Sequence, residues 1–192
     1  LPVVYFDRDP KRCKGEMAVR LDSEGVGRMA AKELLSLGLD NFAFVPSRLP
    51  MDWGEERARA FAAGIKAAGK NHFEFRRPCA ASPAGQREAL EKWLKDLPKP
   101  CGIFASNDCV SEEVVTAAAR LKIAIPSQLA IIGVDNDEQI CERANPPLTS
   151  IMPDFADGGY LSAQLLGRMM ESGSVKPGVH TFAIYAQDAI PE

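Results

Sequence analysis

The sequence predicts an α/β fold built on a parallel sheet, and two observations support this class. Short apolar runs, rich in β-branched and aromatic residues, alternate along the chain with amphipathic stretches of helical length. Strands that alternate with helices form βαβ units, because parallel neighbours need a crossover connection. At 192 residues and 46% hydrophobic, the chain is long enough to bury a substantial core or two smaller ones.

Each strand is predicted where an apolar run is short and bounded by polar or turn residues. We expect strands at residues 3–6, 42–45, 73–75, 102–105, 129–134 and 179–185.

Helices are predicted between these strands, at about 24–37, 54–68, 84–96 and 109–121. Gly38 should end the first of them, because glycine is favoured just after a helix. The pair Asn107-Asp108 offers caps for the last one. Any helix that begins at Glu138 should end before Pro146, because proline breaks helices.

Composition and charge exclude several classes of protein. The formal net charge is −3, so the dense basic surface of a nucleic-acid-binding face is missing. No run of 18 apolar residues could cross a bilayer, and no secretory signal pattern opens the chain. Five cysteines without metal-ligand spacing fit free thiols in a reducing cytoplasm. We therefore expect a cytoplasmic protein that does not contact a membrane.

The first residue is Leu1 rather than Met, and it opens directly into an apolar run. Because termini are usually exposed, a core strand at the first residue is unusual. We expect that the chain begins within a longer protein.

Polar side chains follow four of the predicted strands, at the point where each strand ends. In an open parallel sheet, ligands bind beyond the carboxyl ends of the strands. Neutral polyols are bound by planar polar groups with paired hydrogen bonds and by an aromatic face. The residues of these types at the strand ends, which we take as the candidate ligand-binding set, are Asp7, Arg8, Trp53, Arg57, Asn107, Asp108 and Asp135.

Each candidate also has a purely structural interpretation. Asn107 and Asp108 could simply cap a helix. Asp7 and Arg8 could form a solvated turn, and Trp53 could pack at the edge of a loop. For Arg57 the alternative is a surface salt bridge with the neighbouring glutamates.

Catalytic and cofactor sites find little support. Neither His72 nor His180 lies beside a Ser or Cys in a nucleophile motif. The segment Gly25-Val26-Gly27 is not a dinucleotide fingerprint, and no phosphate loop is present. The acidic run Asp135 to Glu138 suits a turn or cap better than a metal site. We expect no cofactor, no metal and no enzymatic activity; a small α/β enzyme that uses Asp108 or Asp135 as a base is the remaining alternative.

The order of several short motifs resembles that of the sugar-binding domain shared by the lactose-repressor family and the periplasmic ribose- or xylose-type binding proteins. The matching segments run from about Pro2 to about Met170, and the series is more specific than any one of its members. They are Pro2–Arg8, Val19–Gly25, Arg57–Phe61, Asn107-Asp108, Gly133–Asn136 and Pro147–Ile151. Ala60 replaces a glycine of the family pattern.

A narrower likeness is to the xylose-operon activator branch, in which such a sensor is fused to a C-terminal DNA-binding domain. The segments that carry it are Leu97–Ile103, Gly133–Glu138, Pro146–Ser150 and Gly159-Tyr160. Pro153 stands near a position where sugar binders of this type often present a polar residue, so the effector's identity stays open.

The resemblance implies a two-lobed, periplasmic-binding-protein-like (type I) fold whose N-terminal lobe is incomplete in this chain. Residues 1–40 would belong to that lobe, residues 41–147 would form the C-terminal ligand-binding lobe, and residues 148–192 would cross back as a tail. The predicted pocket residues would line a cleft between the lobes, with Trp53 as a wall.

The resemblance also implies a function. It predicts the effector-sensing domain of a bacterial transcription regulator that binds a monosaccharide, most simply a pentose. Such a regulator would be a homodimer, and it would contact DNA only through a domain outside these residues. The alternative is a periplasmic sugar-binding protein of a transporter, which would use the same pocket.

Overall fold

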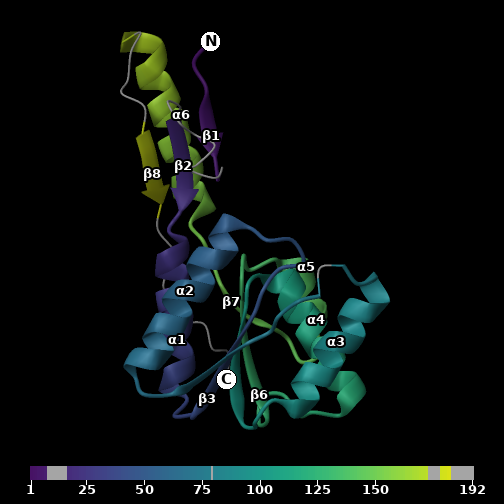
Figure 1. The fold of residues 1–192 in the computed structure, drawn as a ribbon. Coiled ribbons are helices and arrows are strands. Elements are labelled where there is room, and N and C mark those ends of the chain that lie inside the picture. Colours follow the sequence, from purple (N-terminus) through teal and green to yellow (C-terminus); the bar gives the residue numbers. More distant parts are fainter. Residues whose placement is uncertain (8–16, 79, 173–177, 183–192) are drawn as a thin grey trace. The chain divides into compact units, whose positions relative to one another are not determined.

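The computed structural model describes residues 1–7, 17–78, 80–172 and 178–182. They form two compact units (Figure 1). The small unit contains the described residues of Leu1–Asp22 and Pro153–Ala186, and the large unit those of Ser23–Met152. The predicted boundaries after residues 40 and 147 differ from this division, because the first helix packs with the large unit.

The large unit is built on a five-stranded parallel sheet in the order β4-β3-β5-β6-β7. Its strands are β3 (Asn41–Val45), β4 (Asn71–Glu74), β5 (Cys101–Ala105), β6 (Leu129–Val134) and β7 (Thr149–Ile151). Its helices are α1 (Ser23–Ser36), α2 (Asp52–Ala67), α3 (Pro83–Asp96), α4 (Asp108–Leu121) and α5 (Glu138–Arg143).

Helices cover both faces of this sheet, α1 and α2 on one and α3 and α4 on the other (Figure 1). Successive side chains of a strand point to opposite faces, so each strand contributes to two layers. In β3, Ala43 and Val45 join the core beneath α3 and α4. On the opposite face, Phe44 packs against Phe104, which in turn packs against Phe61 of α2.

Helices α1 and α2 pack at very short range, because glycines stand at their contact. A Cβ added to Gly27 would lie 2.9 Å from the Cβ of Ala60 and would also meet the backbone oxygen of Arg57. A Cβ added to Gly64 would lie 2.9 Å from the Cβ of Ala31. The position of α2 therefore depends on the missing side chains of these two glycines.

The small unit has a three-stranded parallel sheet in the order β1-β2-β8. It consists of β1 (Val4–Phe6), β2 (Met17–Leu21), β8 (Gly178–Phe182) and helix α6 (Phe155–Ser172). Phe6 stacks on Phe182 with ring centroids 5.3 Å apart. Gly158 of α6 lies against both rings, and a Cβ there would come within 3.0 Å of them.

The predicted parallel α/β class is confirmed, and helices α1 to α4 lie within two residues of their predicted ends, α1 and α2 each beginning and ending slightly earlier. Gly38 adopts a φ of +69° just beyond α1, as expected of the residue that ends a helix. The predicted strand at 73–75 is displaced, since β4 covers Asn71–Glu74. Strands β2 and β7 and helix α6 were not predicted, and residues 183–185 of the last predicted strand lie outside the described residues. None of the helices in the described part of the chain has the length and apolar character to cross a membrane.

Candidate functional site

The strand order of the large unit fixes where a ligand would bind. From β3 the chain first adds β4 on one side and then β5 on the other. The order therefore reverses between β3 and β5, and ligands of open α/β sheets bind beyond the carboxyl ends of the strands at such a point. The segments that leave β3 and β5 at this edge are Pro46–Met51, which leads into α2, and Ser106-Asn107, which leads into α4.

Arg57 joins the two sides of this switch point. It lies on the second turn of α2, is only 4% exposed, and donates from Nη1 to the backbone oxygen of Ser106 over 2.6 Å. Arg57 is therefore buried rather than on the surface. A buried guanidinium that donates to a backbone carbonyl is held in one orientation.

Trp53 lies one turn before Arg57 on the same helix. The guanidinium carbon of Arg57 stands 4.6 Å from the centre of the indole ring, a cation–π contact. The indole is half-buried, so part of it stays accessible at this edge. Two of the predicted residues are thus in direct contact.

Asn107 caps helix α4, as its structural interpretation predicted. Its Oδ1 accepts from the backbone N–H of Val110 over 3.1 Å. The side chain is half-buried, and its amide nitrogen is the group left for another partner.

Asp135 follows β6, the strand next to β5. Phe104 pairs with Ile132 in the parallel ladder, so β5 and β6 end at the same edge of the sheet, where Asn107 and Asp135 follow them. Asp135 has a φ of +105°, a conformation that side chains rarely adopt. Non-glycine residues held in such conformations cluster at functional sites.

Asp108 lies behind this edge rather than on it, with only 1% of its surface exposed. Its Oδ1 accepts from the Ser150 hydroxyl over 2.6 Å, and its Oδ2 accepts from the backbone N–H of Asp137 over 2.9 Å. The Cys141 thiol lies 3.5 Å from the same Oδ2. Burial raises the pKa of Asp108, and these three hydrogen bonds oppose that rise. The geometry gives this carboxylate a structural role.

Of the two remaining candidates, Asp7 belongs to the small unit. Asp7 is exposed, has a φ of +50°, and donates its backbone N–H to the oxygen of Val19 over 2.7 Å. It stands at the carboxyl end of β1, as predicted. Arg8 lies outside the described residues.

Sequence reasoning missed the residues that hold the candidates in place. Ser106 was not singled out, because its contribution to Arg57 is a backbone oxygen that no sequence pattern reveals. Ser150 was seen only as part of a motif, although its hydroxyl contacts Asp108. Gly133 carried the clearest signal: a Cβ there would collide with the Asp108 carboxylate and lie 2.6 Å from the Ser111 hydroxyl.

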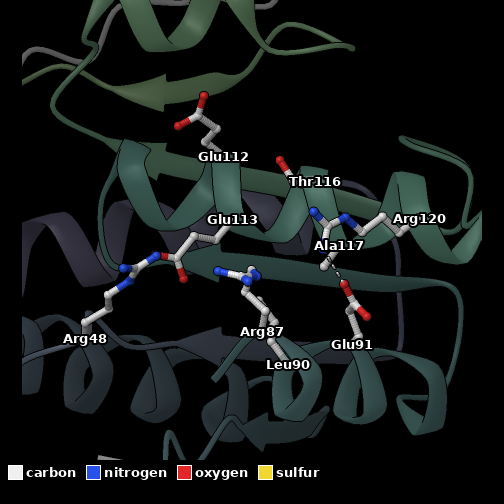
Figure 2. A pocket seen from close by; sticks show the side chains of 9 residues that line it. All are labelled: Arg48, Arg87, Leu90, Glu91, Glu112, Glu113, Thr116, Ala117 and Arg120. Atoms are coloured by element: carbon white, nitrogen blue, oxygen red, sulfur yellow. Dashed lines mark hydrogen bonds and ion pairs between the residues drawn. The ribbon is translucent and has the colours of Figure 1, made fainter. Parts of the chain in front are cut away.

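A hollow of about 130 Å³ lies between α3 and α4 and includes none of the predicted site residues. Figure 2 shows charged side chains of both signs around it, with Arg87 of α3 projecting toward α4. Arg48 contacts Glu113 over 2.7 Å, and Arg120 contacts Glu91 over 3.2 Å. The lining residues are Arg48, Arg87, Leu90, Glu91, Glu112, Glu113, Thr116, Ala117 and Arg120.

Metal binding finds no support in the described part of the chain. No group of three or more His, Cys, Asp or Glu side chains lies there in a position to hold a metal ion. The Cys141 thiol beside Asp108 has its pKa raised to about 12 by burial and by the neighbouring carboxylate, so it is a neutral thiol rather than a thiolate ligand.

The periplasmic binding protein-like domain matches residues 18–185, which is most of the sequence. The chain belongs to this family. The family assignment agrees with the parallel sheet, its switch point and the polar residues at its carboxyl edge.

Similar curated proteins are transcription regulators. The chain is 29% identical over 164 residues to the xylose operon regulatory protein of Haemophilus influenzae, a match that covers 82% of this chain and 42% of that protein. It is 27% identical over 158 residues to the protein of the same name from Escherichia coli K12, covering 80% of this chain and 40% of that protein. The chain therefore spans less than half the length of these relatives.

Solved structures show the same fold. The structure of the xylose-binding transcription activator xylR superposes with a TM-score of 0.81 at 22% identity, over 96% of this chain and 50% of that one. A periplasmic binding protein/LacI transcriptional regulator from Alkaliphilus metalliredigens, complexed with D-xylulofuranose, gives 0.75 at 24% identity, over 96% and 68%.

Proposed function

We propose that this chain is the effector-binding domain of a bacterial transcription regulator and that its effector is a monosaccharide of the pentose class. The observation that carries the proposal is the Trp53–Arg57–Ser106 arrangement at the switch point of the large sheet. It combines an aromatic surface with a guanidinium held in one orientation, which suits a compact, uncharged polyol.

Three features support a regulator over a transport protein. The similar curated proteins include four that are named as regulatory proteins of a xylose operon. One solved relative is described as a xylose-binding transcription activator. The cysteines with described positions, Cys101, Cys109 and Cys141, are free thiols, as suits a reducing cytoplasm.

In this proposal Asp7, Arg8, Trp53, Arg57, Asn107 and Asp135 bind the sugar. Binding then favours one conformation of the regulator, because a ligand shifts an equilibrium by its differential affinity for the two states. This conformational change is transmitted to a DNA-binding domain outside these residues. The regulator acts as a homodimer in the cytoplasm, and the domain itself catalyses no reaction.

Isothermal titration calorimetry of the full-length gene product against a panel of pentoses and hexoses tests the proposal. We expect one sugar site per chain with a preference for a pentose. No heat with any sugar would contradict effector binding, and binding of hexoses alone would contradict the pentose assignment.

A matched pair of variants on α2 localises the site. Arg57→Lys keeps the charge but loses the planar fork, so we expect sugar affinity to fall at least tenfold. Arg59→Lys, two residues later, changes an exposed side chain that pairs with Glu24 over 2.8 Å. We expect this variant to bind like the parent, and equal losses in both variants would remove Arg57 from the site.

A further inference from the structure

We propose that Asp108 and Ser150 are positioning residues that set the sugar-facing carboxylate of Asp135 without touching the sugar themselves. This inference rests on the proposed function, and it assigns Asp108 a role other than the ligand contact predicted from its sequence position. The argument concerns the turn of residues 135–137, which connects β6 to α5.

Three consecutive backbone N–H groups of this turn are anchored on fixed acceptors. Asp135 N–H donates to the oxygen of Ile151 over 3.0 Å, and Asn136 N–H donates to the Ser150 hydroxyl over 3.0 Å. Asp137 N–H donates to Oδ2 of Asp108 over 2.9 Å. Two of the three acceptors are therefore side-chain oxygens rather than backbone oxygens.

Ser150 and Asp108 act as one unit. The Ser150 hydroxyl donates to Oδ1 of Asp108 over 2.6 Å while accepting from Asn136, so the carboxylate fixes the orientation of the hydroxyl. Gly133 leaves room for that carboxylate, because a Cβ at this position would collide with it. One oxygen of the Asp108 carboxyl group thus accepts from Ser150, and the other accepts from the turn itself.

The turn needs such anchors because its backbone is strained. Asp135 has a φ of +105° and Asn136 a φ of +52°. A conformation of this kind is unfavourable for a residue other than glycine and persists only where its surroundings hold it. When an anchor is removed, the turn can relax, and the Cα–Cβ direction of Asp135 changes with its φ.

Asp108 cannot itself reach a sugar in this arrangement. It is 1% exposed, and both of its oxygens already accept hydrogen bonds from the protein. A ligand contact would have to displace Ser150 or the N–H of Asp137. Any effect of Asp108 on sugar binding must therefore act by changing the turn of residues 135–137.

Ser150→Ala and Ser150→Thr, in the full-length protein, separate positioning from general stability. Alanine removes the hydroxyl, whereas threonine keeps it and suits a strand. We expect at least a tenfold rise of the Kd for the pentose in Ser150→Ala and a Kd within twofold of the parent in Ser150→Thr. Thr149→Ala, the adjacent exposed residue of β7, is the matched control and should leave the Kd unchanged.

The binding stoichiometry and the backbone resonances decide between the outcomes. A merely destabilised Ser150→Ala protein would show fewer binding sites with an unchanged Kd, and this result would overturn the proposal. The amide resonances of residues 135–137 in the ligand-free protein should shift in Ser150→Ala and be restored in Ser150→Thr. If the parent binds no sugar, the proposed function fails, and unchanged amide resonances in Ser150→Ala would overturn the positioning role independently.

Discussion

The carboxyl edge of the large sheet and the hollow between α3 and α4 both contain arginines, yet they hold them in opposite ways. Arg57 is 4% exposed and is fastened to a backbone oxygen and an indole ring. The side chains of Arg48 and Arg120 are 52% and 57% exposed and are paired with glutamates. The carboxyl edge holds its arginine in one orientation by packing, whereas the arginines of the hollow are exposed to solvent.

This difference separates a candidate binding site from a charged surface. Exposed ion pairs are screened by water and contribute little, so their side chains are not held in one geometry. Buried polar groups persist only with well-placed partners, and those partners fix the direction of each donor and acceptor. A ligand binds more favourably to a region of buried and partnered polar groups, because folding has already ordered these side chains.

Replacing Asp135 at the carboxyl edge should give the largest effect. If its carboxylate binds the sugar, Asp135→Ala should weaken binding by about 2–4 kcal/mol, because truncation leaves the partner groups without their acceptor. This corresponds to a Kd increase of roughly 30-fold to several hundredfold. Titration calorimetry measures it.

Glu138→Ala provides the control, because Glu138 is an exposed carboxylate three residues later in the first turn of α5. It should bind sugar like the parent. Parent-like affinity in Asp135→Ala would mean that the strained turn serves packing alone.

The close contact of α1 with α2 should give the next largest effect. In Gly27→Ala the new methyl group would meet the backbone oxygen of Arg57 and lie 2.9 Å from the Cβ of Ala60. Overpacking of this kind costs typically 1–3 kcal/mol of stability. We expect this loss in denaturant unfolding, together with weaker sugar binding, because α2 carries both Trp53 and Arg57.

Gly159→Ala is the matched control on α6, since no atom lies within 4 Å of the position of its added Cβ. Alanine there should be neutral or slightly stabilising, because it restricts the unfolded chain. A Gly27→Ala protein as stable as the parent would show that α1 and α2 can separate at little cost.

The sequence predicted the helices and strands better than the contacts between them. The runs at Phe42–Val45 and Leu129–Val134 are apolar and short, so their strands could be recognised directly. Strand β2 was not predicted, because Arg20 interrupts its apolar pattern. In the structure Arg20 is nevertheless buried, with 8% of its surface exposed. Helix α6 was not predicted, because Gly158 and Gly159 suggest a turn. In the structure Gly158 instead allows α6 to pack closely against two phenylalanine rings.

For the candidate site, too, the sequence predicted positions better than contacts. The strand-end rule predicted that Arg57, Asn107 and Asp135 lie near the carboxyl edge, because this edge of a parallel sheet follows from the order of the elements. Their contact with a sugar stays a prediction. It could not distinguish Asp108, which is adjacent in sequence to Asn107 but is enclosed by Ser150 and the turn. Such a distinction depends on side-chain direction, which is set by tertiary packing.

A smaller, pH-dependent effect should come from His72, which lies on β4 in edge-to-face contact with Phe61. Burial lowers the pKa of His72 below its usual value of 6.5. The unfolded chain then binds the proton more tightly, so the free energy of unfolding should decline as the pH falls from about 6.5 through the folded pKa.

His72→Phe should remove this part of the pH dependence while keeping an aromatic side chain against Phe61. Denaturant unfolding at several pH values between neutral and mildly acidic compares the two proteins. The idea fails if the parent and His72→Phe lose stability in parallel over that range.

The smallest effect is expected in the hollow between α3 and α4. Arg120→Gln removes the ion pair with Glu91, whose two side chains are 57% and 26% exposed. Exposed pairs contribute roughly 0–1 kcal/mol, so we expect a loss of stability below about 0.5 kcal/mol in low salt and less in high salt, where screening is stronger. Sugar affinity should not change, because none of the predicted site residues lines this hollow. A large loss of affinity in Arg120→Gln would instead mean that the hollow communicates with the sugar site, and the contrast between a packed and a solvated region would no longer separate binding from surface charge.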